Sequence, residues 1–562
     1  MNKSYEKYIP FKQINLPDRQ WPNKVIEKAP IWCSVDLRDG NQALVDPMNL
    51  EEKLEFFKLL CDMGFKEIEI GFPSASDTEY EICRELIEGN HIPDDVTIQV
   101  LVQAREHLIR KTFEAIEGAK NVIIHFYNST STLQRKVVFQ KDMEGVTEIA
   151  VKGAKLIKEL TEAYTGDANI RFEYSPESFS GTEVDFAVDI CARVMEELGS
   201  TKENPVILNL PNTVEMCTPN TYADQVEYFI KKLPNREAAI ISVHPHNDRG
   251  CGVAACELAL LAGADRVEGT LFGNGERTGN LDIVTVGLNM FTQGVDPQLD
   301  FSDLPKLREV YERCTNMKIH QRTPYVGELV FTAFSGSHQD AINKGMQYMK
   351  DSGTPYWEIP YLPIDPADVG REYEPIIRIN SQSGKGGAAF IMAHNYGYDM
   401  PKKMHPEFSE LVQKSCDQLG RELVPNELMK IFEDSYINAL RKYELIGHPV
   451  VKEIGANGNM VRVTGVLRTN GDKSTDVNIS GDGNGPIDAF FHALESVGVC
   501  NYHFVDYSQH AISTGSDSKA VSYIQLMTPQ GKNIFGVGIS SNIYRSSLFG
   551  VLNAINRAET QK

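Results

Sequence analysis

The chain has 562 residues, of which 41% are hydrophobic and 24% charged, a composition typical of a soluble protein with more than one hydrophobic core. With 77 Asp and Glu against 56 Lys and Arg, its net charge is −21 at pH 7, which disfavours nucleic acid or an anionic membrane as the main partner and favours small-molecule substrates. The ten cysteines form no C-x-x-C pair, the N-terminus has no apolar signal segment and no apolar window is long enough to span a bilayer, so we expect a cytoplasmic protein.

After an N-terminal extension over residues 1–30, residues 31–305 alternate between short β-branched runs and longer amphipathic stretches. In the first such stretch, Asn49 and Glu52 form a predicted capping box and Gly64 a predicted helix end. Eight strands followed by helices favour a (β/α)8 barrel over the six-stranded Rossmann sheet. The strands are expected at 31–37, 66–72, 97–102, 121–127, 169–175, 205–210, 238–243 and 264–272.

Residues 306–438 change to helical patterns separated by loops, which predicts a helical accessory region. Residues 439–562 return to strands and contain an internal repeat. Within it, residues 476–498 and residues 533–557 both run from a strand through a Gly or Ser turn into an amphipathic helix. A duplicated ββα unit is the simplest interpretation. We therefore expect an α/β chain made of a TIM barrel, a helical linker and a small duplicated α+β domain suited to an effector.

The loops after the strand carboxyl ends of a (β/α)8 barrel converge on one mouth, where its chemistry takes place. The motif "SVHPHNDRG" follows the seventh strand, and in extended backbone His244 and His246 point to the same side. Asp39 follows the first strand in "LRDGNQ". Taken alone, each motif is more often a polar loop or a D-G turn. Placed on one mouth, they supply a carboxylate and two imidazoles, a ligand set for a divalent ion with open positions.

The segment "GNGERTGN" follows the eighth strand, and its glycine spacing does not fit the G-x-G-x-x-G of dinucleotide-binding proteins. We expect this loop to bring Asn274, Glu276 and Asn280 close to the mouth. Polar groups also lie within or just after the fourth, fifth and sixth strands. Each of these polar residues is unremarkable alone, but their convergence with the metal motif predicts an active site. The residues are His125, Ser175, Glu177, Asn209 and Thr213.

With "LRDGNQ", "HPHNDRG" and "GNGERTGN" in place, the chain resembles the long form of the 2-isopropylmalate synthases, which belong to the acyl-CoA condensing enzymes on TIM barrels. The resemblance covers nearly the whole chain. It includes the segments "SPESFSGTE", "NLPNTVEM" and "YLPIDPADVGREYE". It implies that acetyl-CoA, the co-substrate, condenses with 3-methyl-2-oxobutanoate, that water then cleaves the thioester, and that 2-isopropylmalate and CoA leave in the first committed step of leucine biosynthesis.

The resemblance also implies a role for each metal-site residue. A divalent ion, Mg²⁺, Mn²⁺ or Zn²⁺, would be held by Asp39, His244 and His246, with Asn280 beside it directly or through water. Arg38 would contact the keto oxygen and stabilise the alkoxide that forms there.

The same comparison assigns the substrate pocket. Thr213 would hold the carboxylate of the 2-oxo acid, and His125, Ser175 and Asn209 would line the pocket for its side chain. Glu177 would complete the site.

A base must remove a proton from the acetyl methyl group, and a neutral histidine suits this task near pH 7. In the family pattern a His and a Tyr from the accessory region approach the mouth, and they match His338 of "FSGSHQD" and Tyr373 of "GREYE". His338 is equally compatible with a surface position at a helix start. If it acts in catalysis, we expect it to reach the barrel of another subunit, which would make the enzyme an obligate homodimer.

The C-terminal domain resembles the leucine-responsive domain of this family. We expect leucine to bind between the duplicated units and to inhibit, near the Gly-rich turns at 481–485 and 536–538. The alternative is a dimerisation module without an effector response. The residues concerned are Gly481, Gly483, Gly536 and Gly538.

Three other functions are less consistent with the sequence. A homocitrate or citramalate synthase would use the same chemistry on a different 2-oxo acid, and a branched apolar group supplies only about 1–3 kcal/mol of discrimination. A non-catalytic effector-binding barrel would have no physical need of the metal ligands. A biotin-dependent carboxyltransferase would need a biotinyl motif, and no A-M-K-M sequence occurs.

Overall fold

The structure is a computed structural model that describes residues 4–333, 335–373, 387–419, 423–438, 441–454, 460–512 and 518–560. The chain divides into two compact units, which are described one at a time. The first unit comprises Met1–Phe331 and Pro363–Tyr373, and the second comprises Thr332–Leu362 and Glu374–Lys562. Among the described residues, no helix combines the length and the apolar character needed to cross a membrane.

The first unit contains a closed barrel of eight parallel strands, in which each strand pairs with its neighbour in the chain and β8 pairs with β1. The predicted (β/α)8 barrel is therefore confirmed. Its strands are β1 (Ile31–Ser34), β2 (Glu67–Gly71), β3 (Thr97–Gln103), β4 (Asn121–Ser129), β5 (Asn169–Glu177), β6 (Val206–Asn212), β7 (Ala239–Pro245) and β8 (Arg266–Gly269).

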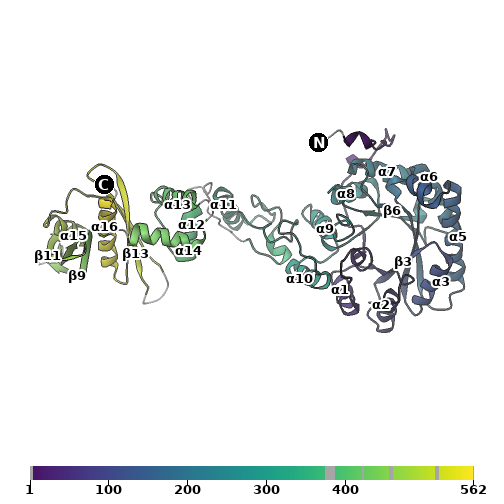
Figure 1. The fold of residues 1–562 in the computed structure, drawn as a ribbon, viewed down its shortest axis with the longest axis horizontal. Helices are drawn as coiled ribbons and strands as arrows, with labels where there is room; N and C mark the ends of the chain where they lie inside the picture. Colours follow the sequence, from purple (N-terminus) through teal and green to yellow (C-terminus); the bar gives the residue numbers. More distant parts are fainter. Residues whose placement is uncertain are drawn as a thin grey trace. The chain divides into compact units, whose positions relative to one another are not determined.

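Helices surround this barrel on the outside (Figure 1). The predicted capping box is present at the first of them, since the Asn49 side chain accepts from the Glu52 N–H and the Glu52 carboxylate accepts from the Asn49 N–H. Gly64 ends this segment with a φ of +102°, which favours glycine. The helices are α1 (Leu50–Asp62), α2 (Asp77–Glu88), α3 (Glu106–Ala115), α4 (Thr132–Gln134), α5 (Met143–Glu162), α6 (Val184–Leu198), α7 (Pro219–Lys232), α8 (Gly252–Ala262), α9 (Ile283–Phe291) and α10 (Leu304–Thr315).

The first strand ends earlier than the sequence predicts, and a single π-helical turn over Asp36–Gly40 replaces its last residues. The carbonyl of Val35 accepts hydrogen bonds from the N–H groups of Asp39 (2.9 Å) and Gly40 (3.1 Å). The Asp36 carboxylate accepts from the N–H of Leu271 at 3.0 Å, which ties this turn to the loop after β8. The turn bends Asp39 over the end of the barrel.

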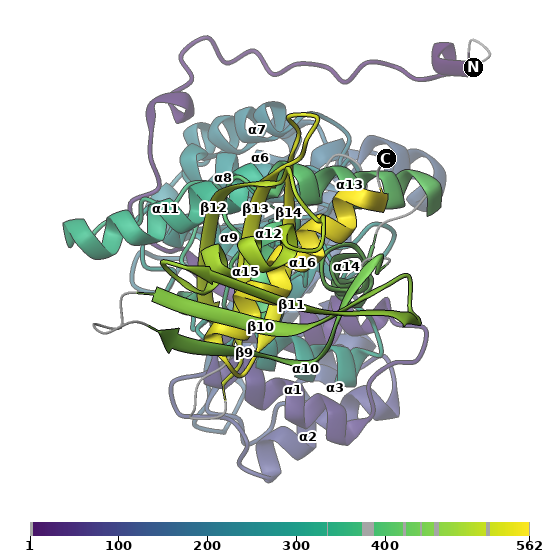
Figure 2. The same cartoon turned by 90° about the vertical axis from the view of Figure 1, so that its left-hand side faces the viewer.

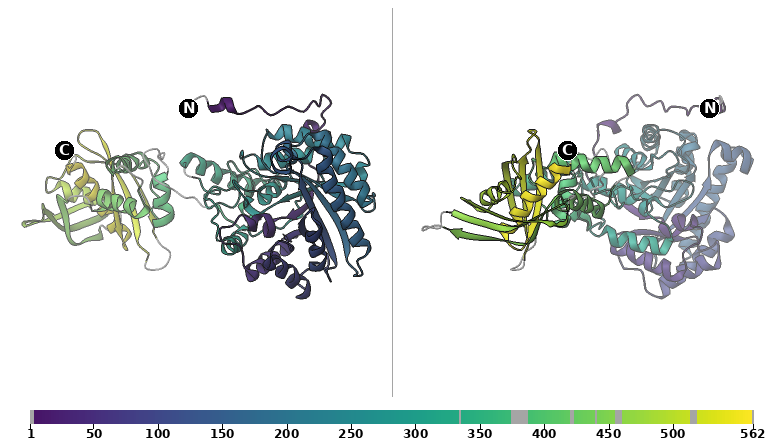
Figure 3. Two further views of the ribbon diagram at one scale, coloured as in Figure 1. Left: turned by 45° about the vertical axis from the view of Figure 1, so that its right-hand side comes forward. Right: turned by 60° about the vertical axis from the view of Figure 1, so that its left-hand side comes forward.

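The N-terminal extension lies against the outside of the barrel where it approaches α7 (Figure 3). The buried carboxylate of Asp224 accepts from Arg19 Nε (2.9 Å), Arg19 Nη2 (2.7 Å) and Trp21 Nε1 (2.8 Å). Glu227, one turn along the same helix, accepts from the N–H groups of Gln20 and Trp21. Residues 19–21 are therefore fastened to two acidic groups of α7.

The second unit contains the helices α11 (Gly336–Ser352), α12 (Gly387–Tyr396), α13 (His405–Leu419) and α14 (Pro425–Phe432) and two three-stranded antiparallel sheets (Figure 2). One sheet joins β9 (Tyr443–Ile454), β10 (Met460–Thr469) and β11 (Asp472–Gly483) and packs on α15 (Pro486–Glu495). The other joins β12 (His503–Ala511), β13 (Ala520–Met527) and β14 (Asn533–Ser540) and packs on α16 (Ile543–Thr560). The predicted duplication is confirmed, with βββα as the repeated unit rather than ββα.

Helices α12 to α14 share a hydrophobic core with the second of these sheets. Phe408 and Phe432 of the helices belong to one cluster with Tyr523 and Phe535 of β13 and β14. Part of the accessory region and part of the C-terminal domain therefore share one core, and the boundary expected between residues 438 and 439 stays a prediction.

Candidate active site at the barrel mouth

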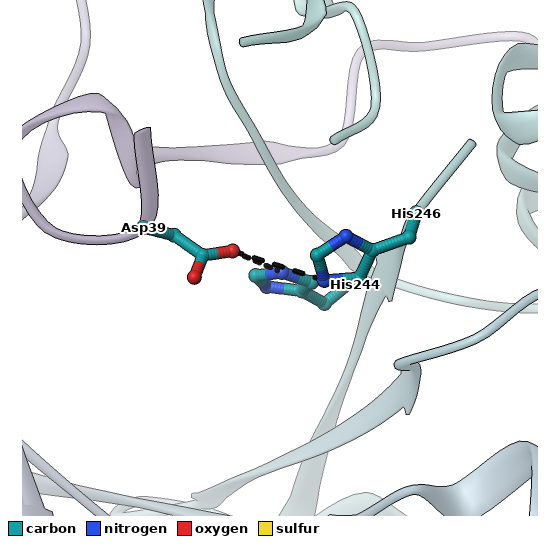
Figure 4. A group of neighbouring side chains, drawn as sticks. All are labelled: Asp39, His244 and His246. Carbon is teal, nitrogen blue, oxygen red and sulfur yellow. Dashed lines mark hydrogen bonds and ion pairs between the residues drawn. The ribbon is translucent and has the colours of Figure 1, made fainter. Parts of the chain in front are cut away.

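Asp39, His244 and His246 meet at the carboxyl ends of β1 and β7, and we call them the metal triad. The Nε2 atom of His244 lies 3.2 Å from Asp39 Oδ2, and Nε2 of His246 lies 3.8 Å from the same oxygen (Figure 4). All three side chains are buried. A carboxylate oxygen and two imidazole nitrogens that converge in this way are a ligand set for a divalent metal ion.

Asn280, the fourth residue predicted beside the metal, lies in the loop after β8 and forms an antiparallel bridge with His246. Its Nδ2 group donates to the carbonyl of Asn274 at 3.1 Å. Its Oδ1 atom is buried and has no hydrogen-bond partner among the described residues. A buried acceptor without a partner costs about 1–3 kcal/mol, and a cation would supply the missing interaction. The residues present therefore fit a metal ion.

The charges of the triad depend on one another. Burial alone would raise the pKa of Asp39, but the Arg38 guanidinium and the two imidazoles hold it well below its usual range. Burial opposes the charged form of His244 too, but its hydrogen bonds to Asp39 and Glu268 raise its pKa to about 9. Burial and the neighbouring charge of His244 lower the pKa of His246 to about 4. Because the pKa of His244 is raised, a proton and a metal ion compete for this ring.

Arg38 is fixed beside the triad by two carboxylates. Its Nη1 group donates to Asp39 Oδ1 at 2.6 Å and its Nε group donates to Glu69, and only 13% of its side chain is exposed. A guanidinium held in this way presents a positive charge in a fixed place, as stabilisation of a developing anion requires.

A row of hydrogen bonds crosses the barrel next to the triad. Nε2 of His125 lies 2.7 Å from Ser175 Oγ, which accepts from Asn209 Nδ2 at 3.1 Å. His125 Nδ1 lies 2.7 Å from Glu69 Oε2. The row therefore places three predicted pocket residues, from β4, β5 and β6, side by side.

A cavity of about 350 Å³ opens above the triad and this row, and we call it the mouth cavity. Thr213 and Glu177 lie on its wall, where Thr213 Oγ1 accepts from the Ser178 N–H at 3.0 Å and Glu177 accepts from Ser129. The structure thus gathers ten predicted residues around one space: Arg38, Asp39, His125, Ser175, Glu177, Asn209, Thr213, His244, His246 and Glu276.

Beneath the mouth cavity, the barrel interior holds charged residues that the sequence analysis missed. Glu268 Oε2 accepts from His244 Nδ1 at 2.8 Å, and Arg266, which is fully buried, donates to Glu67 and to Glu268. The signal was present in the strands "KEIEIGF" and "ADRVEGTLF", where charged residues recur at every second position. Such residues share one face of a strand, so a pair of them in a buried strand indicates a charged barrel interior.

Glu69, His125 and Glu268 form a second group that could hold a metal ion by its spacing. Their oxygens already accept from protein donors, because Glu69 bonds to Arg38, and Glu268 bonds to Arg266 at 2.8 Å. The guanidinium groups therefore supply the positive charge that an ion would bring.

The two residues predicted from the accessory region lie in different units. His338, in the first turn of α11 in the second unit, is exposed, and its ring stacks on Tyr361 with 4.1 Å between centroids. Tyr373 belongs to the first unit; its hydroxyl is buried without a hydrogen-bond partner among the described residues, and burial raises its pKa. Their catalytic roles stay predictions.

The four glycines expected at effector turns lie in strands instead. Gly481 and Gly483 belong to β11 and Gly536 and Gly538 to β14. A Cβ atom on any of them would come closer than 3.0 Å to the backbone of α15 or α16. Glycine is therefore required here for the close approach of helix and sheet. Leucine binding near them stays a prediction.

Three protein families match successive parts of the chain. HMGL-like proteins match residues 29–310, the alpha-isopropylmalate synthase post-catalytic domain matches residues 328–393, and the LeuA allosteric (dimerisation) domain matches residues 422–559. Among solved structures, the HMG-CoA lyase from Brucella melitensis covers 52% of this chain and 100% of its own, with a TM-score of 0.40 and 18% identity.

Proteins named 2-isopropylmalate synthase are similar along almost the whole length. That of Clostridium acetobutylicum is 55% identical over 559 residues, which are 99% of both chains. That of Rhodospirillum rubrum is 53% identical over 551 residues, which are 98% of both chains. That of Brucella suis is 55% identical over 552 residues, again 98% of both chains. The chain therefore belongs to the 2-isopropylmalate synthase family.

Proposed function

We propose that this chain condenses acetyl-CoA with 3-methyl-2-oxobutanoate and hydrolyses the thioester, which gives 2-isopropylmalate and free CoA. The observation that carries the proposal is the buried metal triad with Arg38 at the edge of the mouth cavity. Family membership supports the same reaction, because the relatives carry its name over their full length.

We propose that the metal triad, with Asn280 beside it, holds a divalent ion. When bound, this ion acts as a Lewis acid toward a 2-oxo acid. Two imidazoles and one carboxylate suit Zn²⁺ or Mn²⁺ better than Mg²⁺, which prefers oxygen ligands.

The side chains around the mouth cavity have distinct tasks in this proposal. Arg38 places its fixed charge where the keto oxygen becomes an alkoxide. The hydroxyl of Thr213 binds the carboxylate of the 2-oxo acid. The row of His125, Ser175 and Asn209 bounds the space for the branched side chain, next to the apolar walls formed by Leu101 and Pro211.

A base must take one proton from the acetyl methyl group before the new carbon–carbon bond forms. We propose His338 as that base and Tyr373 as a second catalytic residue, as the family pattern implies. The methylene carbon then attacks the keto carbon, the keto oxygen receives the electron pair, and water cleaves the thioester to release the CoA thiol. His338 is exposed, so its imidazole is accessible to a substrate.

The charge of the mouth cavity favours a 2-oxo acid with an apolar side chain. Its two arginines are bonded to carboxylates, Arg38 to Asp39 at 2.6 Å and Arg277 to Asp248 at 2.6 Å. A homocitrate synthase needs a cation for a second, distal carboxylate, and neither arginine is available without breaking a pair.

A panel of 2-oxo acids tests the proposed substrate. Release of the CoA thiol from acetyl-CoA is measured with 3-methyl-2-oxobutanoate, pyruvate and 2-oxoglutarate, and the products are identified by mass. We expect the highest kcat/KM with 3-methyl-2-oxobutanoate. A higher value with pyruvate or 2-oxoglutarate would identify a citramalate or homocitrate synthase instead.

We propose further that the enzyme is a dimer inhibited by leucine through its C-terminal domain. The match to an allosteric (dimerisation) domain over residues 422–559 and the duplicated βββα unit support this. Inhibition by leucine but not by D-leucine, together with a dimer in sedimentation, is the expected result; turnover that leucine leaves unchanged would refute the regulation. We also propose a cytoplasmic location, for which the scattered cysteines argue.

A further inference from the structure

Glu268 lies in β8 with its side chain fully buried in the barrel interior. Each of its two oxygens accepts two hydrogen bonds. Oε2 accepts from His244 Nδ1 at 2.8 Å and from Asn209 Nδ2 at 3.1 Å. Oε1 accepts from Gln99 Nε2 at 3.0 Å and from Arg266 Nη1 at 2.8 Å. One oxygen therefore joins a residue of the metal triad to a residue of the predicted substrate pocket.

We propose that Glu268 is a positioning residue that couples the metal centre to the pocket for the 2-oxo acid. Its Oε2 atom fixes the His244 ring with the proton on Nδ1, so that Nε2 faces Asp39 and is the nitrogen that binds the ion. The same oxygen fixes the amide of Asn209. The substrate part of this inference rests on the proposed function, whereas the metal part does not.

The hydrogen-bond pattern requires a carboxylate at this position. Four side chains donate to Glu268, two at each oxygen, so both ends of the side chain accept. In a glutamine one end is an NH2 group, which can only donate. If that end faces His244, the ring is driven to the tautomer with its proton on Nε2, which cannot bind metal through that atom. If it faces Arg266, two donors meet there instead.

Glu67 provides a matched control for the structural part of this role. It is buried in the same barrel and accepts from the same arginine, through Arg266 Nε at 2.6 Å, and from Arg171. Within the described part of the chain, the hydrogen bonds and ion pairs of Glu67 reach no member of the metal triad. Glu67→Gln therefore disturbs the charged barrel interior as Glu268→Gln does, but leaves His244 and Asn209 with their acceptor.

The first test measures metal affinity in the full-length protein, by titration of the metal-free variants with Zn²⁺ and by the absorption spectrum of the Co²⁺ form. We expect Glu268→Gln to bind Zn²⁺ about 10–100-fold more weakly and to alter the Co²⁺ spectrum, with Glu67→Gln close to the unmodified protein. Equal losses in both variants, or no loss in Glu268→Gln, would overturn the proposal. This readout does not depend on catalysis, so it stands even if the proposed reaction is wrong.

The second test separates the two substrates kinetically at saturating metal. Glu268→Gln is expected to raise the KM for 3-methyl-2-oxobutanoate at least about fivefold and to leave the KM for acetyl-CoA unchanged, because only the 2-oxo acid pocket contains Asn209. An unchanged KM for the 2-oxo acid would overturn the coupling. If the unmodified protein releases no thiol, the proposed function is refuted. The metal-affinity measurement alone then tests the role of Glu268.

A conservative variant covers the case in which Glu268→Gln does not fold. Glu268→Asp keeps the charge opposite Arg266 but draws the carboxylate back by one carbon–carbon bond, about 1.5 Å. It is expected to fold and to bind Zn²⁺ at least about fivefold more weakly, since it cannot reach both His244 and Asn209. Unchanged affinity in Glu268→Asp would overturn the proposal.

Discussion

Replacing Arg38 by lysine keeps a positive charge at the barrel mouth but removes the geometry that fixes it. The guanidinium donates from two nitrogens to two carboxylates, Asp39 and Glu69, in a site where 13% of the side chain is exposed. A single ammonium group cannot reproduce this fork. One buried carboxylate oxygen then loses its donor, which costs about 1–3 kcal/mol of stability. The charge also leaves the place where the alkoxide forms, which is expected to lower kcat by about 10²–10³.

The assay for Arg38→Lys combines thiol release with calorimetry. We expect the large fall in kcat, a KM for acetyl-CoA near that of the unmodified enzyme, and a melting temperature lowered by a few degrees. Arg110→Lys is the matched control, because Arg110 is exposed and, among the residues that the structure describes, pairs with Glu106 of its own helix. A folded Arg38→Lys enzyme with kcat within about threefold of the unmodified value would refute this role of the guanidinium.

Three further predictions concern other parts of the chain. Gly536→Ala forces β14 and α16 apart and should destabilise the second unit by about 1–3 kcal/mol. Gly465→Ala is the control, because a Cβ atom at that position meets no atom closer than 3.5 Å. Equal melting temperatures of the two variants would refute the packing role of Gly536. Because the pKa of His244 is raised to about 9, metal binding at pH 7 should release about one proton, and the metal affinity should increase from pH 7 to pH 9. Calorimetry in buffers of different ionisation enthalpy measures the protons released on binding. A finding that no proton is released would contradict this prediction. His338→Ala should lower kcat about 10²–10⁴-fold, and co-expression with Arg38→Gln should restore activity if the base serves a partner subunit's barrel.

The barrel and the position of its site could be predicted because both depend on local patterns. Eight β-branched runs separated by amphipathic stretches limit the fold to few topologies, and the parallel barrel then places every strand end on one mouth. Asp39 and His244, 205 positions apart, were predicted as neighbours on that ground, and Asp39 Oδ2 lies 3.2 Å from Nε2 of His244. Their roles as metal ligands stay a prediction.

The barrel interior could not be predicted in the same way, because its contacts join strands that are distant in sequence. Arg266 bonds to Glu67, 199 positions away, and to Gln99, 167 positions away. Charge alternation within β2 and β8 indicates that such partners exist but does not identify them. The π-helical turn after β1 was missed too, since it depends on the bond from Leu271 to Asp36 across the barrel end.

The glycines of the C-terminal repeats show a different limit. A Gly-rich run is typical of a turn, and 481–485 and 536–538 were interpreted as turns for that reason. In the structure Gly481 and Gly536 lie in strands, each under the backbone of the following helix. Sequence alone does not separate a glycine that turns the chain from one that admits a close neighbour.

Metal removal tests the central claim most directly. The unmodified full-length protein is treated with EDTA, freed of chelator, and assayed for thiol release from acetyl-CoA with 3-methyl-2-oxobutanoate before and after addition of Zn²⁺, Mn²⁺ or Mg²⁺. We predict that activity is lost on stripping and returns with at least one of these ions, while Asp39→Asn stays inactive under all conditions. Full activity in the stripped protein, or an Asp39→Asn variant as active as the unmodified enzyme, would contradict the proposed metal-dependent condensation.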